Sequence, residues 1–424
     1  MMGKRVFIAG TCRTPVGKFG QRLKDVPAQE LLRKCFAETV KRTGIKFSDV
    51  EEAIAGTCIH LPDALNVARV AVLLASCTDE QLKSFRKEGV FPKEVFRDSP
   101  TRNTPAFTVA RNCGSGLQAI FSATQEILSD NYQVILAGGT ESMSNSPGMI
   151  KRGSFVFRQV DVTITDSLLH GLTDPLTGEL MGLTAENVAE KHGITREEQD
   201  KYAAESHQRA FRAIREGKFK SQIVPVDVRD VNLLGHVRES QVSEDEGPEP
   251  SLTASKLGIL KPYFKAGGTV TPANSCMVND GAASCLVLSL EKAKELGVTP
   301  EAEIIAYAGC ALDPSYMGEG PVYAIPAVLK AAGLTIDDID VFEINESFAS
   351  TTIAVQRQLN IPSEKLNIHG GALSLGHPVG ASGAILTVKA VGLLKELKKT
   401  YAIVSLCVGN GQGVALLIKN YDNG

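Results

Sequence analysis

Residues 108–120, TVARNCGSGLQAI, place one cysteine between an apolar run and a helix-like tail. A cysteine there lies where a strand turns into a helix, so that the first free N–H groups of the helix point at its sulfur. The positive end of the helix dipole favours a thiolate and predicts a lowered thiol pKa. The following Gly-Ser-Gly lets other backbone and a substrate approach closely. Cys113 is therefore a candidate nucleophile, although free cysteines are more often small buried hydrophobic residues.

Two glycine-rich segments near the C-terminus carry groups that can assist a thiol. In GGALSLGHPVGASG, residues 370–383, His377 lies in a loop too rich in glycine for ordinary core, and an imidazole beside a thiol can take its proton. In LCVGNGQG, residues 406–413, Cys407 ends an apolar strand and meets a glycine loop. This environment repeats the one inferred for Cys113.

A third segment, NESFA, follows the apolar run of residues 341–344. Its first residue, Asn345, can position a water or donate a hydrogen bond to an oxyanion. By itself this signal is weak, since Asn and Glu are common in loops at strand ends.

The elements that must hold these segments alternate between strands and helices, which indicates an α/β layered fold. Apolar runs predict strands at residues 4–9, 50–57, 105–110, 132–137, 283–289, 302–308, 341–344 and 402–407. Helical spacing and capping patterns predict helices at residues 28–43, 64–76, 184–193, 195–216, 321–332, 348–359 and 383–398. Residues 78–103 are charged, lack a clear period and resemble a surface insertion.

The chain contains an internal repeat. In each half, a segment of small residues opens a helix that is followed by an apolar strand, YQVILAGG in the first half and YAIVSLCVGNG in the second. Two similar units predict a duplicated fold. Residues 142–268 depart from this pattern, and residues 238–250 within them predict an exposed acidic linker.

Composition and charge limit the classes of function. The chain has 424 residues, 45 Lys and Arg, and 48 Asp and Glu, so its formal net charge is −3. That charge, with no Trp and few aromatic residues, gives no support for a nucleic-acid partner. The nine cysteines are scattered without a CxxC pair, which argues against a disulfide framework or a structural zinc site and for a reducing compartment. With no signal-peptide pattern and no membrane-spanning run, we expect a cytoplasmic protein without a membrane partner.

Taken in order, these segments resemble the thiolase family over nearly the whole chain. The motifs that carry the resemblance are TCRTPVGKFG at residues 11–20, NCGSGLQA at 112–119, MGLTAEN at 181–187, GTVT…NDGAA at 268–283, and the three segments NESFA, GHPVGASG and CVGNGQG. Each motif is modest alone, but all of them in this order are highly specific.

The resemblance implies an acetyl-CoA C-acetyltransferase or a 3-ketoacyl-CoA thiolase. Such an enzyme condenses two acetyl-CoA to acetoacetyl-CoA and CoA, or runs the reverse CoA-dependent thiolysis. Cys113 would carry the acyl group as a thioester, His377 would activate it, and Cys407 would act as general acid and base. His377 with a water held by Asn345 would stabilise one oxyanion, and the backbone N–H groups of Cys113 and Gly409 would stabilise the other.

The resemblance also implies the architecture. We expect a duplicated thiolase-like fold of two related layered α/β core domains in the order α-β-α-β-α, with an inserted loop domain. The N-terminal core would span residues 1–290 and contain the loop domain, residues 142–268, on the CoA-binding side. The C-terminal core would span residues 291–424. A homodimer or homotetramer is expected, with CoA as substrate and product, no permanently bound cofactor and no metal.

Three positions are candidates for substrate binding, and each bears on specificity. Met181 opens the MGLTAEN motif, and Leu180 precedes it where short-chain members often carry His, which leaves room for a longer acyl chain. Cys276 takes the place of a serine that often lies near CoA. His369 stands where many members have Asn, so a second imidazole is expected near the site.

Two further departures concern CoA and the donor loop. Asn410 replaces a glycine of the usual run after Cys407 and is expected to alter the donor loop. Glu249 stands in place of an arginine that often meets the nucleotide, so CoA would rely on other groups such as Lys256 or Lys261.

Three alternatives accompany the leading hypothesis. One is a longer-chain 3-ketoacyl-CoA thiolase of fatty-acid β-oxidation. A second is a decarboxylating or acyl-carrier condensing enzyme of related fold, which typically uses two His and lacks a counterpart of Cys407. The third is a non-catalytic thiolase-like binding protein.

Overall fold

The computed structural model describes residues 4–78, 80–82, 93–150, 163–231 and 237–421. The charged insertion predicted at residues 78–103 therefore lies partly outside the described residues. Its described part contains the short helix α4 (Lys93–Arg97).

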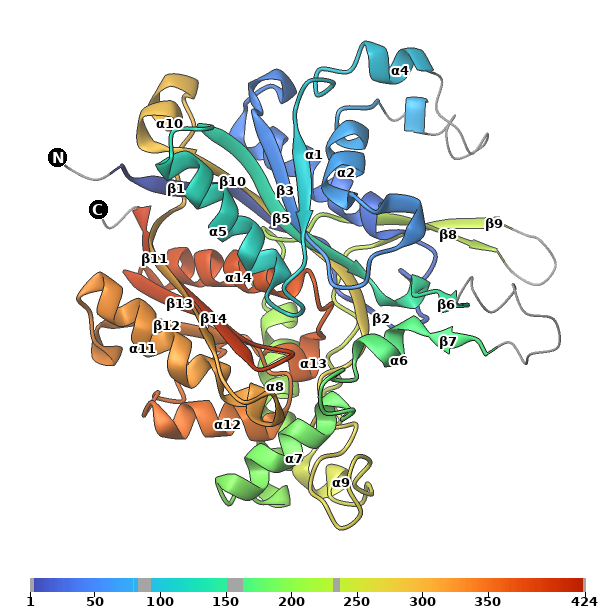
Figure 1. Ribbon diagram of the computed structural model, residues 1–424, viewed down its shortest axis with the longest axis vertical. Helices are drawn as coiled ribbons and strands as arrows, with labels where there is room; N and C mark the ends of the chain where they lie inside the picture. Colours follow the sequence, from blue (N-terminus) through green and yellow to red (C-terminus); the bar gives the residue numbers. More distant parts are fainter. Residues whose placement is uncertain (1–3, 79, 83–92, 151–162, 232–236, 422–424) are drawn as a thin grey trace.

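The first half of the chain forms five neighbouring strands of a mixed sheet, with helices between them (Figure 1). Its elements are β1 (Val6–Arg13), β2 (Gly17–Lys18), α1 (Ala28–Thr43), β3 (Glu52–Gly56), α2 (Val67–Ala75), β4 (Ala106–Val109), α5 (Ser115–Leu128), β5 (Val134–Ser142) and β10 (Asn279–Ser289).

The second half repeats this plan. Its elements are α10 (Leu290–Leu296), β11 (Ala302–Ala311), α11 (Gly320–Ala332), β12 (Val341–Ile344), α12 (Ala349–Gln358), α13 (Ala372–Leu375), α14 (Ser382–Leu397), β13 (Tyr401–Val408) and β14 (Gln412–Asn420).

A long excursion separates β5 from β10. It contains β6 (Gly148–Met149), β7 (Thr165–Asp166), α6 (Ser167–Gly171), α7 (Met181–Lys191), α8 (Arg196–Arg215), β8 (Val226–Val231), β9 (Val237–Val242) and α9 (Ala254–Leu257). Helix α8 begins with the capping box predicted at Thr195 and Glu198. Helix α7 begins three residues before the predicted start at Thr184, whose hydroxyl instead donates to the Met181 carbonyl from inside the first turn.

The strand order confirms the internal repeat. The sheet runs β12-β13-β14-β11-β1-β10-β5-β3-β4, and the two halves join where β1 pairs with β11. In the first half β1, β10 and β5 are antiparallel neighbours and β3 runs parallel to β5; in the second half β11, β14, β13 and β12 follow the same order and directions. Strand β14 was absent from the sequence prediction, which ended at the loop after Cys407.

Successive side chains of each strand face opposite sides of the sheet, where different helices cover them. This arrangement gives the predicted α-β-α-β-α layers. Phe7 of β1 packs under α1 and α2, while its neighbour Ile8 faces α5 and α14. In β13, Ile403 faces the outer helix α11 and Val404 faces the central layer. Helices α5 and α14 thus lie between the half-sheets, as Figure 1 shows.

The first turns of the two central helices are in direct contact, which brings the cysteine and histidine loops to one place. A Cβ on Gly116 would lie 2.8 Å from the Gly380 carbonyl oxygen, and one on Gly383 would lie 2.5 Å from the Leu117 nitrogen. Only glycine permits so close an approach of backbone to backbone.

Residues 238–250 form the exposed linker that their acidity predicted only in part, because the segment begins in β9 and buries Asp245 and Gly247. Asp245 is buried and accepts two hydrogen bonds from the Arg13 guanidinium, at 2.6 and 2.8 Å. Gly247 packs against the Ser374 carbonyl. The acidic residues were misread because a buried bidentate partner is invisible in composition.

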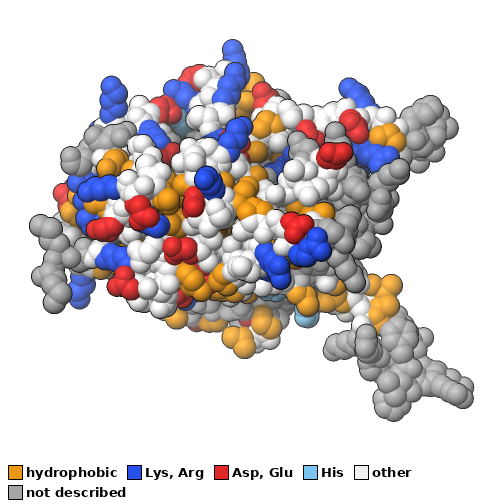
Figure 2. Space-filling model, turned by 90° about the horizontal axis from the view of Figure 1, so that it is seen from above, with side chains coloured by type: hydrophobic (Ala, Val, Ile, Leu, Met, Phe, Trp, Pro, Cys, Tyr) orange, Lys and Arg blue, Asp and Glu red, His pale blue; other side chains and the backbone are white. Residues whose placement is uncertain are grey.

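Acidic and basic side chains lie interspersed on the face seen in Figure 2. Among the helices of the described residues, none has the length and apolar character needed to cross a membrane.

Candidate active site

Cys113 lies in a tight turn that joins β4 to α5. The Gly114 N–H donates to the Arg111 carbonyl at 2.9 Å, and the Ser115 hydroxyl donates to the Asn112 carbonyl at 2.7 Å. Asn112 has a φ of 44°, in the left-handed region. Two backbone N–H groups, that of Cys113 itself and that of Gly409, act to lower the pKa of the Cys113 thiol.

The structure corrects the expectation of a lowered thiol pKa. Burial, followed by the nearby Cys407, raises the pKa of Cys113 to about 12, although both N–H donors act to lower it. Desolvation of the thiolate therefore outweighs the helix terminus. At rest Cys113 is thus a neutral thiol, and it would need a base to act as a nucleophile.

His377 is held as a neutral base. Its Nδ1 lies 2.6 Å from the Ser382 hydroxyl, and that hydroxyl donates its own proton to the Pro378 carbonyl at 2.9 Å. Nδ1 must therefore carry the hydrogen, which leaves a lone pair on Nε2. Burial lowers the pKa of the imidazole to about 4.

A chain of short contacts connects His377 to Cys407. The Asn345 amide lies 3.4 Å from His377 Nε2 and donates to the Ser347 hydroxyl at 2.8 Å. That hydroxyl lies 3.3 Å from Cys407 Sγ, at the end of β13. Burial raises the pKa of Cys407, and its contact with Ser347 opposes that shift. The structure thus brings Cys113, His377, Cys407, Asn345 and Gly409 together at one edge of the central layer.

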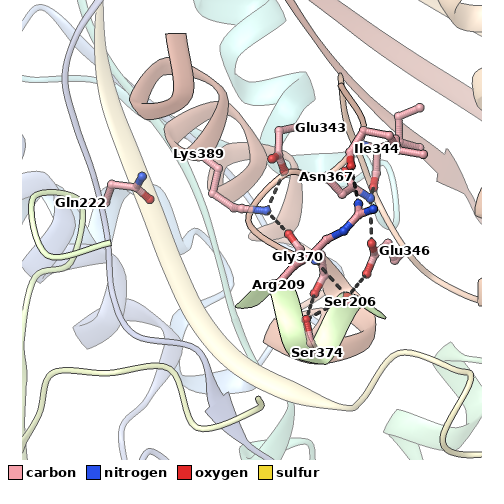
Figure 3. A network of polar contacts seen from close by, with 12 residues as sticks. Ser206, Arg209, Gln222, Glu343, Ile344, Glu346, Asn367, Gly370, Ser374 and Lys389 are labelled. Carbon is pink, nitrogen blue, oxygen red and sulfur yellow. Dashed lines mark hydrogen bonds and ion pairs between the residues drawn. The ribbon is translucent and has the colours of Figure 1, made fainter. Parts of the chain in front are cut away.

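A buried polar network holds the backbone on both sides of Asn345 (Figure 3). The Asn367 amide oxygen accepts from the Ile344 N–H at 2.9 Å, and the same side chain donates to Glu346 at 2.9 Å. Glu346 also accepts from Tyr202 and Ser206 of α8. Helix α8 of the excursion therefore fixes the loop that carries Asn345.

The Lys389–Glu343 ion pair adds a second anchor in Figure 3. Both side chains are buried, and Lys389 Nζ donates to Glu343 at 2.7 Å and to the Gly370 carbonyl at 2.7 Å. This pair connects β12 to α14 and to the start of the histidine loop.

Glu141, at the end of β5, clamps the histidine loop to the loop after β3. Its carboxylate accepts from the Gly380 N–H at 2.8 Å, the Cys58 N–H at 2.8 Å, the Ile59 N–H at 3.1 Å and the Thr57 hydroxyl at 3.1 Å. Burial raises its pKa to about 7, and these donors oppose that shift.

Two of the three predicted substrate-binding residues lie at this site. Met181 packs against the apolar cluster that contains Cys407, together with Phe264, Met317 and Phe348. Cys276 is close enough to both reactive cysteines that their charges, after burial, raise its pKa.

The structure places His369 elsewhere. Its Nε2 lies 2.8 Å from a carboxylate oxygen of Glu396, near the C-terminal end of α14, whereas His377 contacts Ser382 at the N-terminal end. Its ring packs edge-on against Phe219. The position next to the Gly-Gly pair suggested proximity, but the side chain points away along the helix.

Sequence reasoning missed four supporting residues. Ser347 and Ser382 stand inside motifs already noted, and their spacing from Asn345 and His377 was the available signal. Asn279 accepts from the His377 N–H at 2.9 Å, and Glu141 acts through backbone groups. No local pattern could indicate the last two, because their partners are distant in sequence.

The arrangement can transfer an acyl group. The site holds a neutral thiol, a second thiol that can take or give a proton, a neutral imidazole joined to that second thiol through Asn345 and Ser347, and backbone N–H groups near the first thiol.

Comparisons with known proteins extend over almost the whole chain. Residues 6–84 and 93–291 match the family described as "Thiolase, N-terminal domain", and residues 298–420 match "Thiolase, C-terminal domain". A probable acetyl-CoA acyltransferase of Staphylococcus aureus (strain COL) is 41% identical over 418 residues, covering 98% of this chain and 99% of that protein.

Solved structures give the same result. The Bacillus anthracis acetyl-CoA acetyltransferase has a TM-score of 0.89 at 39% identity, covering 99% of both chains. The human mitochondrial 3-ketoacyl-CoA thiolase has a TM-score of 0.88 at 37% identity, again covering 99% of both. A complex of that human enzyme with CoA has a TM-score of 0.88 at 37% identity and covers 98% of both chains.

Proposed function

Because the chain belongs to the thiolase family, an acyltransferase family that acts on CoA thioesters, we propose that it works through an acyl-cysteine intermediate on Cys113. The observation that supports this most strongly is the chain of contacts that joins His377 through Asn345 and Ser347 to Cys407. The N–H groups of Cys113 and Gly409, which act to lower the pKa of the Cys113 thiol, are suited to an oxygen that becomes negative when the thioester carbonyl on this sulfur is attacked.

In the first half-reaction, the Cys113 sulfur attacks the carbonyl carbon of an acyl-CoA. The thiol proton passes to the free Nε2 of His377, since a thiol with a pKa near 12 is protonated at rest. When the carbon–sulfur bond to CoA breaks, the Cys407 thiol gives its proton to the departing CoA sulfur, which leaves Cys407 as a thiolate and His377 as an imidazolium. The products are acyl-Cys113 and CoA.

In the synthetic second half-reaction, Cys407 removes an α-proton from acetyl-CoA, and the resulting carbanion attacks the acyl-Cys113 carbonyl. The Cys113 sulfur leaves and takes back its proton from the His377 imidazolium, while Cys407 keeps the α-proton and is a thiol again. In the thiolytic direction the reverse occurs: a 3-oxoacyl-CoA acylates Cys113 while Cys407 protonates the departing acetyl-CoA enolate, and CoA then removes the acyl group.

The second oxyanion, on the carbonyl of the CoA-bound group, would be stabilised by the N–H that His377 Nε2 carries once it has taken the Cys113 proton, together with a water on Asn345. The support is the position of the Asn345 amide, 3.4 Å from His377 Nε2 and beside Ser347. A water there would have polar partners on two sides.

For the substrate, we propose acyl chains longer than acetoacetyl as well as acetoacetyl itself, as in an acetyl-CoA C-acyltransferase. The apolar cluster of Met181, Phe264, Met317 and Phe348 beside Cys407 supports this, because flexible methionines accommodate different chains. All nine cysteines are free thiols, which supports a reducing compartment such as the cytoplasm.

The test is CoA-dependent cleavage across a series of 3-oxoacyl-CoA chain lengths. We expect cleavage of acetoacetyl-CoA and of longer members only when CoA is added. No cleavage at any length would contradict the proposed activity, and cleavage of acetoacetyl-CoA alone would contradict the proposed breadth.

A further inference from the structure

Asn410 replaces an expected glycine, and its side chain contacts both flanks of the site. Its φ is 67°, a left-handed conformation that Asn tolerates better than most residues. Its Oδ1 accepts from the Asn112 amide at 2.8 Å, and its Nδ2 donates to Asp174 Oδ2 at 2.9 Å. Asn112 immediately precedes the nucleophile, and Asp174 belongs to the excursion between β5 and β10.

We propose that Asn410 is a positioning residue that holds the Gly409 N–H against the Cys113 sulfur, with Asp174 as its anchor. The inference rests on the proposed acyl transfer at Cys113. The proposal gives the Asn410 side chain a role that a glycine at this position could not have.

The Asp174 carboxylate determines which way the side-chain amides of Asn410 and Asn112 face in this row of hydrogen bonds. Asp174 can only accept, so the NH₂ group of Asn410 must face it and the Asn410 oxygen must face Asn112. Asn112 must then present its own NH₂ group, which also donates to the Gly409 carbonyl at 3.1 Å. Gly409 is thereby held at its carbonyl, in the peptide that it shares with Asn410, while its N–H, in the preceding peptide, lies close enough to Cys113 to lower the pKa of that thiol.

The anchor itself is rigid. Asp174 is 1% exposed, and its other oxygen, Oδ1, accepts from the N–H groups of Leu176 and Thr177 at 2.8 and 3.2 Å. The turn that it closes runs into Met181, whose N–H donates to the Leu172 carbonyl at 3.0 Å. The excursion therefore reaches the donor loop through Asn410 close to where α7 presents Met181 to the site.

A purely local explanation is that Asn410 merely occupies a left-handed position. Under that explanation Asn410→Gly, which suits the same φ, would leave catalysis unchanged. Asn360 supplies the matched control: it is exposed, has a φ of 52° and lies at the end of α12, so Asn360→Gly changes backbone freedom in the same way.

The minimal disruption is Asp174→Asn. It keeps an oxygen for Leu176 and Thr177 but sets an NH₂ group against the NH₂ group of Asn410. We expect Asn410→Gly and Asp174→Asn each to slow acetylation of Cys113 on the order of tenfold, with KM for acetyl-CoA within about twofold, because donor misplacement acts on the transition state. Asn360→Gly should acetylate at the wild-type rate.

The swap Asn410→Asp with Asp174→Asn restores a donor opposite an acceptor. The rate of the double variant should recover to within about threefold of wild type, whereas Asn410→Asp alone sets two carboxylates together and should be slow. The rate of Cys113 alkylation at one fixed pH near neutrality, followed on its own peptide, gives a second readout. It should fall in the slow variants, because the Gly409 N–H acts to lower the pKa of this thiol and its loss leaves less thiolate.

Single variants within twofold of wild type, or a swap no faster than its slower parent, would overturn the positioning role. The same holds for slowed acetylation with an unchanged rate of Cys113 alkylation, which would indicate a structural effect alone. If wild-type protein itself never acetylates Cys113, the proposed function fails, and that result is distinguishable from failure of Asn410.

Discussion

Cys113 and His377 are both neutral at rest, because burial acts in opposite directions on their pKa values. It raises the pKa of the thiol to about 12 and lowers that of the imidazole to about 4. Across the neutral pH range the proton therefore stays on sulfur until the carbonyl is attacked. A thiolate formed before the substrate arrives would, in contrast, react readily with alkylating agents.

The titration of His377 gives a prediction at this scale. A protonated imidazole cannot accept the Cys113 proton, so the acylation rate should be flat near neutrality and fall in acid near pH 4. Single-turnover acetylation against pH measures this, with far-UV circular dichroism to confirm that the protein stays folded.

The lowered pKa of His377 also makes the stability of the fold depend on pH. Between about pH 4 and 6.5 the unfolded chain binds a proton at His377 that the folded chain does not, so its contribution to stability is lost as pH falls through that window. In the acetylation experiment, a fall of the rate near pH 6.5 instead of near pH 4 would contradict a buried, neutral His377.

Residue identities were the most predictable part of the site, and ionisation was the least. Cys113, His377, Cys407 and Asn345 each stand in a glycine-rich or strand-end motif readable from the chain. The thiol pKa was mispredicted, because a helix terminus can be seen in sequence whereas the depth of burial depends on the whole fold.

At the scale of elements, loops at the ends of β3, β4, β12 and β13 and at the start of α14 deliver the functional groups. Glu141 at the end of β5 connects two of these loops through four accepted hydrogen bonds. Both of its oxygens are used, so any change that replaces one acceptor with a donor leaves buried N–H groups facing an NH₂ group.

Glu141→Gln tests this clamp. We expect the free energy of unfolding to fall by about 2 kcal/mol and acetylation to slow, because the histidine loop loses an anchor. Urea denaturation and single-turnover acetylation measure the two effects.

Glu52 supplies the matched control. It is also buried, with a pKa raised to about 7 by burial and then by Glu126, but its Oε2 has no hydrogen-bond partner. At pH values above neutral, Glu52→Gln should leave the free energy of unfolding unchanged or raise it. The change removes the charge of a buried carboxylate whose Oε2 has no hydrogen-bond partner. Equal stability of Glu141→Gln and wild type would show that the clamp contributes nothing.

Strand and helix types followed from periodicity, but several boundaries did not. Helix α12 and strand β12 were within about two residues of their predicted ranges, as expected for apolar, periodic segments. Strand β14 was missed, and Asp245 was assigned to an exposed linker. Both depend on long-range partners, β11 and Arg13, which no local window contains.

For the whole molecule, duplication explains why one site needs both halves. The equivalent helices α5 and α14 meet at Gly116 and Gly380, so the nucleophile loop of one half lies against the histidine loop of the other. The layered architecture was predictable from the repeat and the family resemblance, whereas the pairing of β1 with β11 into one continuous sheet was not.

The edge of that sheet supports a prediction about assembly. Strand β4 ends the strand order, pairs only with β3 among the described residues, and its four residues are half-buried. An unpaired edge is a template for another strand. We propose that a second copy covers it in a homodimer or homotetramer. Light scattering should give two or four chain masses, and a single chain mass would contradict the proposal.

The most direct test of the acyl-cysteine mechanism is the mass of the Cys113 peptide after incubation with acetyl-CoA in the absence of free CoA. Wild-type protein should gain one acetyl group on Cys113 and lose it when CoA is added. Cys407→Ser should still be acetylated but should not exchange the α-protons of acetyl-CoA, while Cys113→Ser should form no thioester. Acetylation absent from wild-type Cys113, or present on another residue instead, would contradict the mechanism.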